Sequence, residues 1–245
     1  MPAPLSPSPA IRAAEVDGVR VILDLRSESY HVLEGAADAM WDALAEAGSV
    51  EAALPALERR FRVDRERLRA DLEAFAERCV ERGFIERAGG GLTGGTPTAP
   101  RAPVAARRPS TRLALRSLFA TRRELGRTGL VGAYAACAGS PPAEPEAGPE
   151  IRDRALGAFV RAENLFLARR APDDCLLRSL SLYRFLLAVG VGAEHRIGVR
   201  RFPFGAHAWV EHGDEVLLDD PFHIPAFTVL ARLPDRPDTS AALYR

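Results

Sequence analysis

The stretch Pro172-Asp-Asp-Cys-Leu-Leu-Arg-Ser-Leu-Ser-Leu-Tyr-Arg-Phe-Leu-Leu-Ala-Val189 marks the point where this chain changes from helical to strand periodicity. Its Pro-Asp-Asp opening is a strong helix start, and the apolar residues that follow recur at helical spacing. We therefore predict a helix that begins near Cys175 and ends at about Val189. The sequence after it alternates between apolar and polar residues, which predicts strands at 194–201, 206–211 and 215–219.

The order of elements around this helix indicates an α+β domain. Helical patterns cover roughly 111–137 and 151–170, ahead of the helix at Cys175. Gly213-Asp214 is predicted to form a hairpin turn between the last two strands. Because helices followed by a strand meander are typical of α+β folds, we expect residues 111–245 to form one such domain.

A smaller unit is predicted at residues 1–87. Its first elements are expected to be two short strands, Val19–Leu25 and Ser29–Leu33, because these segments are rich in β-formers. Three helices should follow, from about Ala36 to Ala47, from the N-cap candidate Ser49, and from Asp64 to Gly83. Cys79 lies in the apolar stripe of the third helix and is expected to be a core residue.

Two segments are not expected to pack into either unit. Residues 88–110 are rich in Gly, Pro and Thr, a composition that predicts a flexible linker. Residues 1–10 are rich in Pro and Ser and are expected to be a short disordered lead-in. The chain is thus predicted to consist of 1–87, the linker 88–110 and 111–245.

Composition excludes several classes of protein. The 245 residues carry no net charge, so no overall field attracts nucleic acid or a membrane. No stretch approaches the ~20 apolar residues of a membrane-spanning helix, and the N-terminus lacks the blocks of a signal peptide. The three cysteines show no C-x-x-C spacing, which argues against a disulfide framework and a structural zinc site. We expect a soluble cytoplasmic protein with no nucleic-acid or membrane partner.

Three residue types in the second unit have the chemistry of nucleophilic catalysis. Cys175 is predicted at a helix N-terminus, where unpaired N–H groups favour a thiolate and could hold an oxyanion. His207 lies on a predicted strand, and Asp219 and Asp220 close the next one. A cysteine, a histidine and an acid in this order match a nucleophile, its general base and the acid that orients the base.

The residues alone leave the identity of the orienting acid open. A two-residue turn at Gly213-Asp214 would place His207 opposite Asp220, and such turns are the commoner kind. A three-residue loop would instead place His207 opposite Asp219. Asp220 precedes Pro221, where the chain is expected to leave the strand.

These motifs resemble the leader peptidases of lasso-peptide biosynthesis, which have a transglutaminase-like cysteine protease fold. The resemblance is carried by Cys175-Leu-Leu-Arg-Ser-Leu-Ser-Leu-Tyr-Arg, Arg196-Ile-Gly-Val-Arg, and His207-Ala-Trp-Val-Glu followed by Val216-Leu-Leu-Asp. The family places its acid twelve residues after the histidine, which selects Asp219 in this sequence. The chain departs from the family at Leu218, where a polar residue, often Asn, is expected.

The first unit resembles the RiPP precursor recognition element, a winged-helix-like domain related to the pyrroloquinoline quinone chaperone. The two resemblances imply a winged-helix-like recognition domain (a small sheet plus three helices) fused to a transglutaminase-like, papain-like cysteine protease domain. They also imply two partners, the leader of a ribosomal precursor peptide and an asparagine-synthetase-like lasso cyclase that would join the freed core amine to an acidic side chain. No cofactor is expected, and the spacings of His195, His212 and His223 match no metal site.

Leader binding is expected at the strand Ser29–Leu33, because an extended peptide could add to it if it is an edge strand. Tyr30 and Val32 on this strand are candidate contacts. Leu68 and Leu72 of the third helix could wall an adjacent groove, although their spacing also fits a core-facing stripe.

Two other functions fit the same residues. A transglutaminase-type acyltransferase would use the same triad, with an amine in place of water as the second nucleophile. A non-enzymatic winged-helix regulator would explain the first unit, but the acidic side chains of its third helix disfavour contact with phosphates. Those acidic residues are Asp71, Glu73, Glu77 and Glu81.

Overall fold

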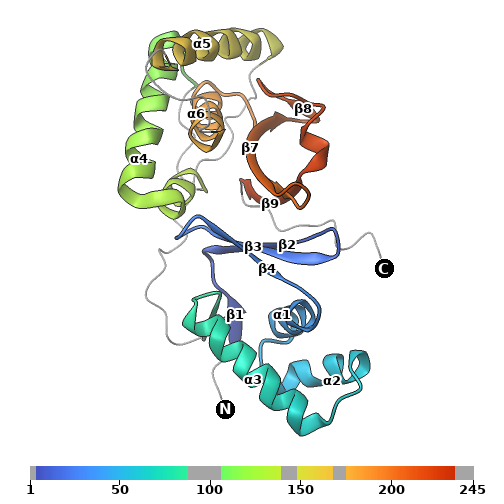
Figure 1. Cartoon of the computed structure of the whole chain (residues 1–245). Helices are drawn as coiled ribbons and strands as arrows, with labels where there is room; N and C mark the ends of the chain where they lie inside the picture. Colours follow the sequence, from blue (N-terminus) through green and yellow to red (C-terminus); the bar gives the residue numbers. More distant parts are fainter. Residues whose placement is uncertain (1–3, 88–105, 139–147, 168–174, 235–245) are drawn as a thin grey trace. The chain divides into compact units, whose positions relative to one another are not determined.

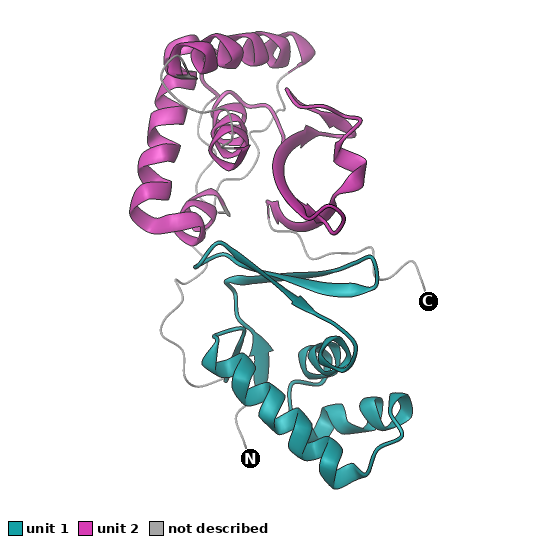
Figure 2. Ribbon diagram, viewed as in Figure 1, with its two compact units in different colours: residues 1–96 teal, residues 97–245 magenta. Residues whose placement is uncertain are grey.

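The computed structural model describes residues 4–87, 106–138, 148–167 and 175–234 (Figure 1). The chain divides into two compact units, residues 1–96 and 97–245 (Figure 2). Both units combine helices with antiparallel strands, which confirms the α+β class.

The boundary between the two units, after Thr96, lies within the predicted linker 88–110. Residues 88–105 of this linker lie outside the described residues. The backbone N–H of Arg107 donates to the carbonyl of Ala188 at 2.9 Å. The last residues of the predicted linker therefore pack with the second unit.

The first unit holds a three-stranded antiparallel sheet followed by three helices. In this sheet β3 (Val19–Asp24) lies between β2 (Ile11–Val16) and β4 (Ser29–Leu33). The helices are α1 (Ala36–Ala47), α2 (Val50–Arg60) and α3 (Arg65–Glu81). A second, two-stranded sheet pairs β1 (Leu5–Pro7) with β5 (Ile85–Arg87).

Capping residues explain where these helices begin and end. The Ser49 side chain accepts a hydrogen bond from the N–H of Ala52 at the start of α2. The Asp64 carboxylate accepts from the N–H groups of Glu66 and Arg67 at the start of α3. Gly48 ends α1 with a φ of 69°, a left-handed conformation that glycine adopts without strain. The predicted N-cap at Ser49 and the predicted start of the third helix at Asp64 are confirmed.

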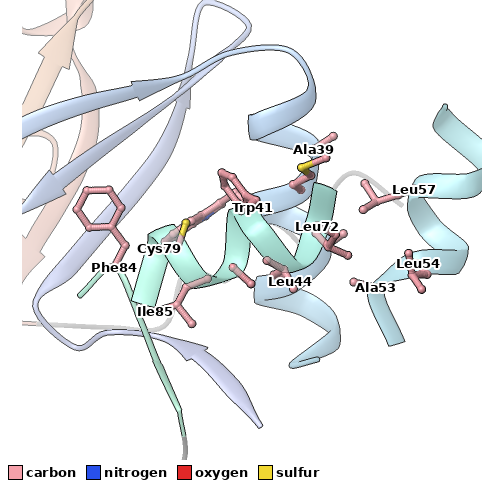
Figure 3. Packing of buried hydrophobic residues seen from close by; sticks show 14 of the residues in the cluster. Ala39, Trp41, Leu44, Ala53, Leu54, Leu57, Leu72, Cys79, Phe84 and Ile85 are labelled. Atoms are coloured by element: carbon pink, nitrogen blue, oxygen red, sulfur yellow. The ribbon is translucent and has the colours of Figure 1, made fainter. Parts of the chain in front are cut away.

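The core of the first unit is formed by the apolar faces of the three helices and by the sheet (Figure 3). Leu44, Leu54 and Leu72 have no exposed surface, and Trp41 is 4% exposed. Burying each leucine side chain contributes roughly 1.5–3 kcal/mol. Cys79 is 3% exposed within this cluster, which confirms its prediction as a core residue.

The expectation of a disordered lead-in over residues 1–10 is wrong. Leu5–Pro7 forms β1, whose partner strand lies about 80 residues later in the chain. The N–H of Leu5 also donates to the carbonyl of Gly48 at 2.7 Å. A three-residue strand that contains proline has no alternating pattern, so only its distant partner makes it a strand.

We predict that Ser8→Ala destabilises the first unit by about 1–2 kcal/mol, because Ser8 is 3% exposed and its hydroxyl donates to the Glu86 carboxylate at 2.6 Å. Hydrogen exchange should accelerate in β1 and β5. Ser27→Ala is the matched control, since the exposed Ser27 hydroxyl contacts the side chains of Ser29 and Asp24 and neither β1 nor β5 contains these residues. Equal exchange in the two variants would contradict the prediction.

The second unit packs three helices with a four-stranded antiparallel sheet. The helices are α4 (Thr111–Ala138), which is kinked at Gly129, α5 (Pro149–Leu167) and α6 (Cys175–Ala188). The sheet order is β8-β7-β6-β9, with bounds Glu194–Arg200 for β6, Gly205–His212 for β7, Glu215–Val216 for β8 and Thr228–Leu233 for β9. Helix α6 contacts α4 on one side and β6 and β7 on the other (Figure 1).

The sheet of the second unit differs from its prediction in two ways. The strand predicted at 215–219 ends at Val216, and the edge strand β9 was not predicted. The short helical turn η1 (Ile224–Ala226) precedes β9 and interrupts the alternating pattern of apolar and polar residues.

Within the described residues, no helix is both long and apolar enough to cross a membrane.

Candidate active site

Cys175 is the first residue of α6 and is partly exposed. The preceding Pro172-Asp-Asp segment, predicted to start this helix, lies outside the described residues. The chain's other cysteines differ, because burial raises the pKa of both Cys79 and Cys137 to about 11. Cys175 is therefore the only cysteine of the three that combines access to solvent with a helix N-terminus.

His207 lies near the start of β7 and is directly paired with Gly198 of β6. Its ring stacks with that of Trp209, with an interplanar angle of 12° and a centroid distance of 6.1 Å. Phe227 is a second aromatic neighbour, with its ring centroid 5.6 Å from that of His207. These aromatic neighbours restrict the imidazole to a narrow range of orientations.

Asp219 contacts His207 through a hydrogen bond of 2.8 Å between Oδ2 and Nε2. Its other carboxylate oxygen accepts from the N–H of Asp220. Asp220 itself turns elsewhere, because its carboxylate accepts from the N–H of Phe222 and lies 3.0 Å from Nδ1 of His223.

The hairpin explains why Asp219, and not Asp220, meets the histidine. His212 pairs with Glu215, so the turn has two residues, as the commoner loop length predicted. That register would have brought Asp220 opposite His207, but the ladder stops after Val216. Leu218 then adopts a φ of 55°, which breaks the strand alternation and redirects the residue that follows.

The left-handed backbone at Leu218 explains why Asn is often expected at this position. Among residues with a Cβ, Asn is one of the few that tolerate this conformation, and a leucine there is strained. An Asn at this position would therefore adopt the same backbone with less strain than the leucine.

The environment of His207 raises its pKa above the ordinary value. The largest cause is a hydrogen bond with the Cys175 side chain, and the Asp219 hydrogen bond and charge act in the same direction against partial burial. Because Nε2 contacts Asp219, Nδ1 is the ring nitrogen left for a hydrogen bond with the thiol. A raised pKa stabilises the imidazolium, so this contribution to folding is full below about pH 6.5 and is lost as pH rises through the raised pKa.

A buried polar cluster supports the aromatic ring beneath His207. The indole N–H of Trp209 donates to Glu211 Oε1 at 2.7 Å. The Glu211 carboxylate, 8% exposed, also forms an ion pair with Arg196 at 2.9 Å. These contacts fix the indole plane on which the imidazole stacks.

Gly198 leaves the space that the indole occupies. A Cβ at this position would lie 2.7 Å from Cη2 and 2.9 Å from Cζ3 of Trp209, and 3.0 Å from the carbonyl oxygen of Thr228. We predict that Gly198→Ala lowers the free energy of unfolding by about 1–3 kcal/mol through this overlap, measured by urea denaturation.

The matched control for that variant is Gly126→Ala, because nothing lies within 4 Å of a Cβ at Gly126. An alanine there should leave stability unchanged or raise it by up to about 1 kcal/mol, since Gly126 lies inside α4. A stability of Gly198→Ala equal to that of the control would contradict the packing argument.

Two side chains that could in principle donate to an oxyanion, Arg178 and Asn164, are placed elsewhere. Arg178 donates to the Glu163 carboxylate, which is 9% exposed, so its guanidinium is held by an ion pair between α5 and α6. Asn164 lies on the exposed side of α5. With no glutamine in the chain, the backbone N–H groups at the start of α6 are the donors that the described structure offers.

The four predicted leader contacts separate into two groups. Leu68 and Leu72 are 3% and 0% exposed and belong to the core cluster, so they offer no surface to a peptide, and the groove expectation for them is corrected. Tyr30 is half-buried and Val32 is 49% exposed on β4, which is an edge strand as expected. Helical spacing cannot separate a groove wall from a core face.

Comparison with known proteins identifies the second unit. The model of the transglutaminase-like superfamily matches residues 101–232. The chain belongs to this superfamily. Within the first unit, residues 20–85 match the family of coenzyme PQQ synthesis protein D. The two matches occur in the order that the sequence motifs indicated.

One curated relative is similar to part of the chain. The transglutaminase-like chain is similar to the microcin J25-processing protein McjB of Escherichia coli, with 40% identity over 61 residues. That alignment covers 25% of this chain and 29% of McjB, less than two thirds of the relative.

Two solved structures are also similar to part of the chain. They are TbiB1 in complex with the TbiA(beta) leader peptide and lasso peptide synthetase B1 complexed with the leader peptide. Each is 26% identical, with a TM-score of 0.32; they cover 33% and 34% of this chain and 94% and 99% of those chains. The two family matches and the similarity to McjB confirm the resemblance to lasso-peptide B proteins.

Proposed function

We propose that this protein is a cysteine peptidase that binds the leader of a ribosomally made precursor peptide and cleaves leader from core during lasso-peptide maturation. The observation that carries the proposal is the position of His207, which hydrogen-bonds Asp219 on one side and the Cys175 thiol on the other. Membership of the transglutaminase-like superfamily and the similarity to McjB support it.

Each member of the proposed triad has a separate task. The Cys175 thiol transfers its proton to His207, and the thiolate attacks the carbonyl carbon of the scissile peptide bond. The electron pair of the carbonyl moves to its oxygen, where N–H groups at the start of α6 stabilise the charge. Asp219 keeps the imidazole oriented and stabilises the imidazolium that forms.

The tetrahedral intermediate then collapses to a thioester, which water hydrolyses in a second stage. The C–N bond breaks, and the imidazolium of His207 gives its proton to the leaving nitrogen, which releases the core with a free N-terminal amine. A thioester between the leader and Cys175 remains. Water attacks this thioester while His207 accepts its proton, and the leader leaves with a terminal carboxylate.

Leader binding is assigned to the edge strand β4 in the first unit. Among the described residues, β4 pairs only with β3, so its other side can accept an extended peptide as a further strand. Val32 and Tyr30 share one face of this strand and would contact alternate side chains of the leader. The match of residues 20–85 to the PQQ synthesis protein D family supports this assignment.

A lasso cyclase similar to asparagine synthetases is the second proposed partner. It would take the core once its amine is free and join that amine to an acidic side chain of the core. Cleavage must precede this step, because the backbone amine is part of a peptide bond until the leader is removed.

The first test uses Cys175→Ala. Incubated with a precursor peptide encoded beside the gene for this chain, the variant should give no cleaved leader by mass spectrometry, while its leader affinity stays within about two-fold of wild type. Cys79→Ala and Cys137→Ala are the controls and should cleave, because both thiols are buried.

Cleavage by Cys175→Ala would refute the nucleophile assignment. The product mass also separates hydrolysis from acyl transfer. In the presence of added amine, a leader amide would indicate a transglutaminase-type reaction, whereas a leader carboxylate supports the peptidase.

The acid that orients His207 is tested by two neighbouring variants. Asp219→Asn should slow cleavage by about 10²–10⁴-fold, because it removes the carboxylate that holds the imidazole. Asp220→Asn should stay within a few-fold of wild type, since its carboxylate faces Phe222 and His223. The rate constants at saturating precursor decide the matter, and the reverse ranking would transfer the role to Asp220.

A further inference from the structure

His195 is a fully buried histidine that the proposed mechanism does not use. It lies on β6 with no exposed surface. Its Nδ1 is 2.9 Å from the hydroxyl of Tyr134 on α4, and its Nε2 is 2.9 Å from the hydroxyl of Ser179 on α6. The ring thus joins two helices to the sheet with both nitrogens engaged.

The directions of these hydrogen bonds follow from the hydrogens available. The Ser179 hydroxyl lies 2.7 Å from the carbonyl oxygen of Cys175 and 3.3 Å from that of Leu176. A carbonyl oxygen can only accept, so the single hydroxyl hydrogen of Ser179 points to it. Nε2 of His195 must then donate to the serine oxygen, and Nδ1 accepts from Tyr134.

The protonation state of His195 agrees with this arrangement. A neutral imidazole has one donor and one acceptor, which the two hydroxyls require. Burial lowers the pKa of His195 to about 3, so the ring is neutral across the physiological range. The hydrogen-bond network therefore runs in one direction: Tyr134 donates to His195, His195 donates to Ser179, and Ser179 donates to the backbone carbonyl of residue 175.

This hydrogen-bond network connects α6, which carries Cys175, to the sheet that carries His207. Cys175 is at the start of α6, one turn before Ser179. His207 is on β7, where it pairs with Gly198 of β6, three residues after His195. The separation of thiol and imidazole is set by how α6 lies on this sheet. Apolar packing between them is non-directional, whereas hydrogen bonds fix both position and rotation.

We propose that His195 is a positioning residue, which through Ser179 and Tyr134 holds the first turn of α6 against β6 and so keeps the Cys175 thiol within reach of His207. The inference rests on the catalytic pair of the proposed function. Misplacing reacting groups by about 1 Å can cost on the order of 100-fold in rate, so a small shift of α6 has a large effect.

The test measures the alkylation rate of Cys175 by iodoacetamide, which needs no peptide substrate. The labelled residue is identified by peptide mapping, and Cys79 and Cys137 are buried. Ser179→Ala removes the link from the ring to the carbonyl. Ser181→Ala is the matched control, because Ser181 is on the same helix, is fully buried, and its hydroxyl has no hydrogen-bond partner among the described residues.

The expected result depends on pH. At about pH 6, where an unassisted thiol is almost entirely protonated, Ser179→Ala should react ~10-fold more slowly than wild type, and Ser181→Ala within about two-fold. At about pH 9.5 an exposed thiol ionises without help, so all three rates should converge. A change in access to the thiol alone would slow alkylation equally at both pH values.

The results distinguish failure of the positioning role of His195 from failure of the proposed catalytic pair, Cys175 and His207. Equal rates for Ser179→Ala and Ser181→Ala at about pH 6, or equal slowing at both pH values, overturn the positioning role. His207→Ala is measured alongside: if it leaves the profile unchanged, the catalytic pair of the proposed function fails instead. If circular dichroism shows that Ser179→Ala is unfolded, Tyr134→Phe, which removes the other hydroxyl, is judged by the same two comparisons.

Discussion

The hydrogen bond between His207 and Asp219 is the interaction on which the proposed chemistry depends, and it requires a strand that ends early. The β7–β8 ladder stops at Val216, and the left-handed backbone of Leu218 then brings the Asp219 carboxylate back to the imidazole. With Nε2 held in this way, the raised pKa of His207 favours the imidazolium that a cysteine nucleophile needs as its partner.

Rigid surroundings give this pair its orientation. The imidazole stacks on Trp209, whose indole is tied to Glu211, and Gly198 leaves the room that the indole needs. On the other side, His195 joins α6 to the sheet through buried hydrogen bonds. Buried polar groups of this kind are costly unless every partner is present, so they specify one arrangement of helix and sheet.

In the proposed function, the two units divide recognition from chemistry. The first unit presents an edge strand, β4, while the second carries the thiol, the imidazole and the carboxylate. The match to the PQQ synthesis protein D family and the match to the transglutaminase-like superfamily fall on separate units. Under this proposal, the first unit holds the leader of the peptide substrate while the second unit cleaves the scissile bond.

Sequence by itself determined the elements whose signals are local: the helices with caps at Ser49 and Asp64, the central strands, and the order of Cys175, His207 and the acid. Tertiary structure decided what depends on distant partners. The strands β1 and β9 exist through pairing across the chain, and Leu68 and Leu72 are core residues because the helices fold onto them. The choice of Asp219 over Asp220 followed from one backbone angle at Leu218, and the role of His195 from two hydroxyls on other elements. The periodicity of a sequence indicates which face of a helix or strand is apolar, but it does not indicate which distant residue packs against that face.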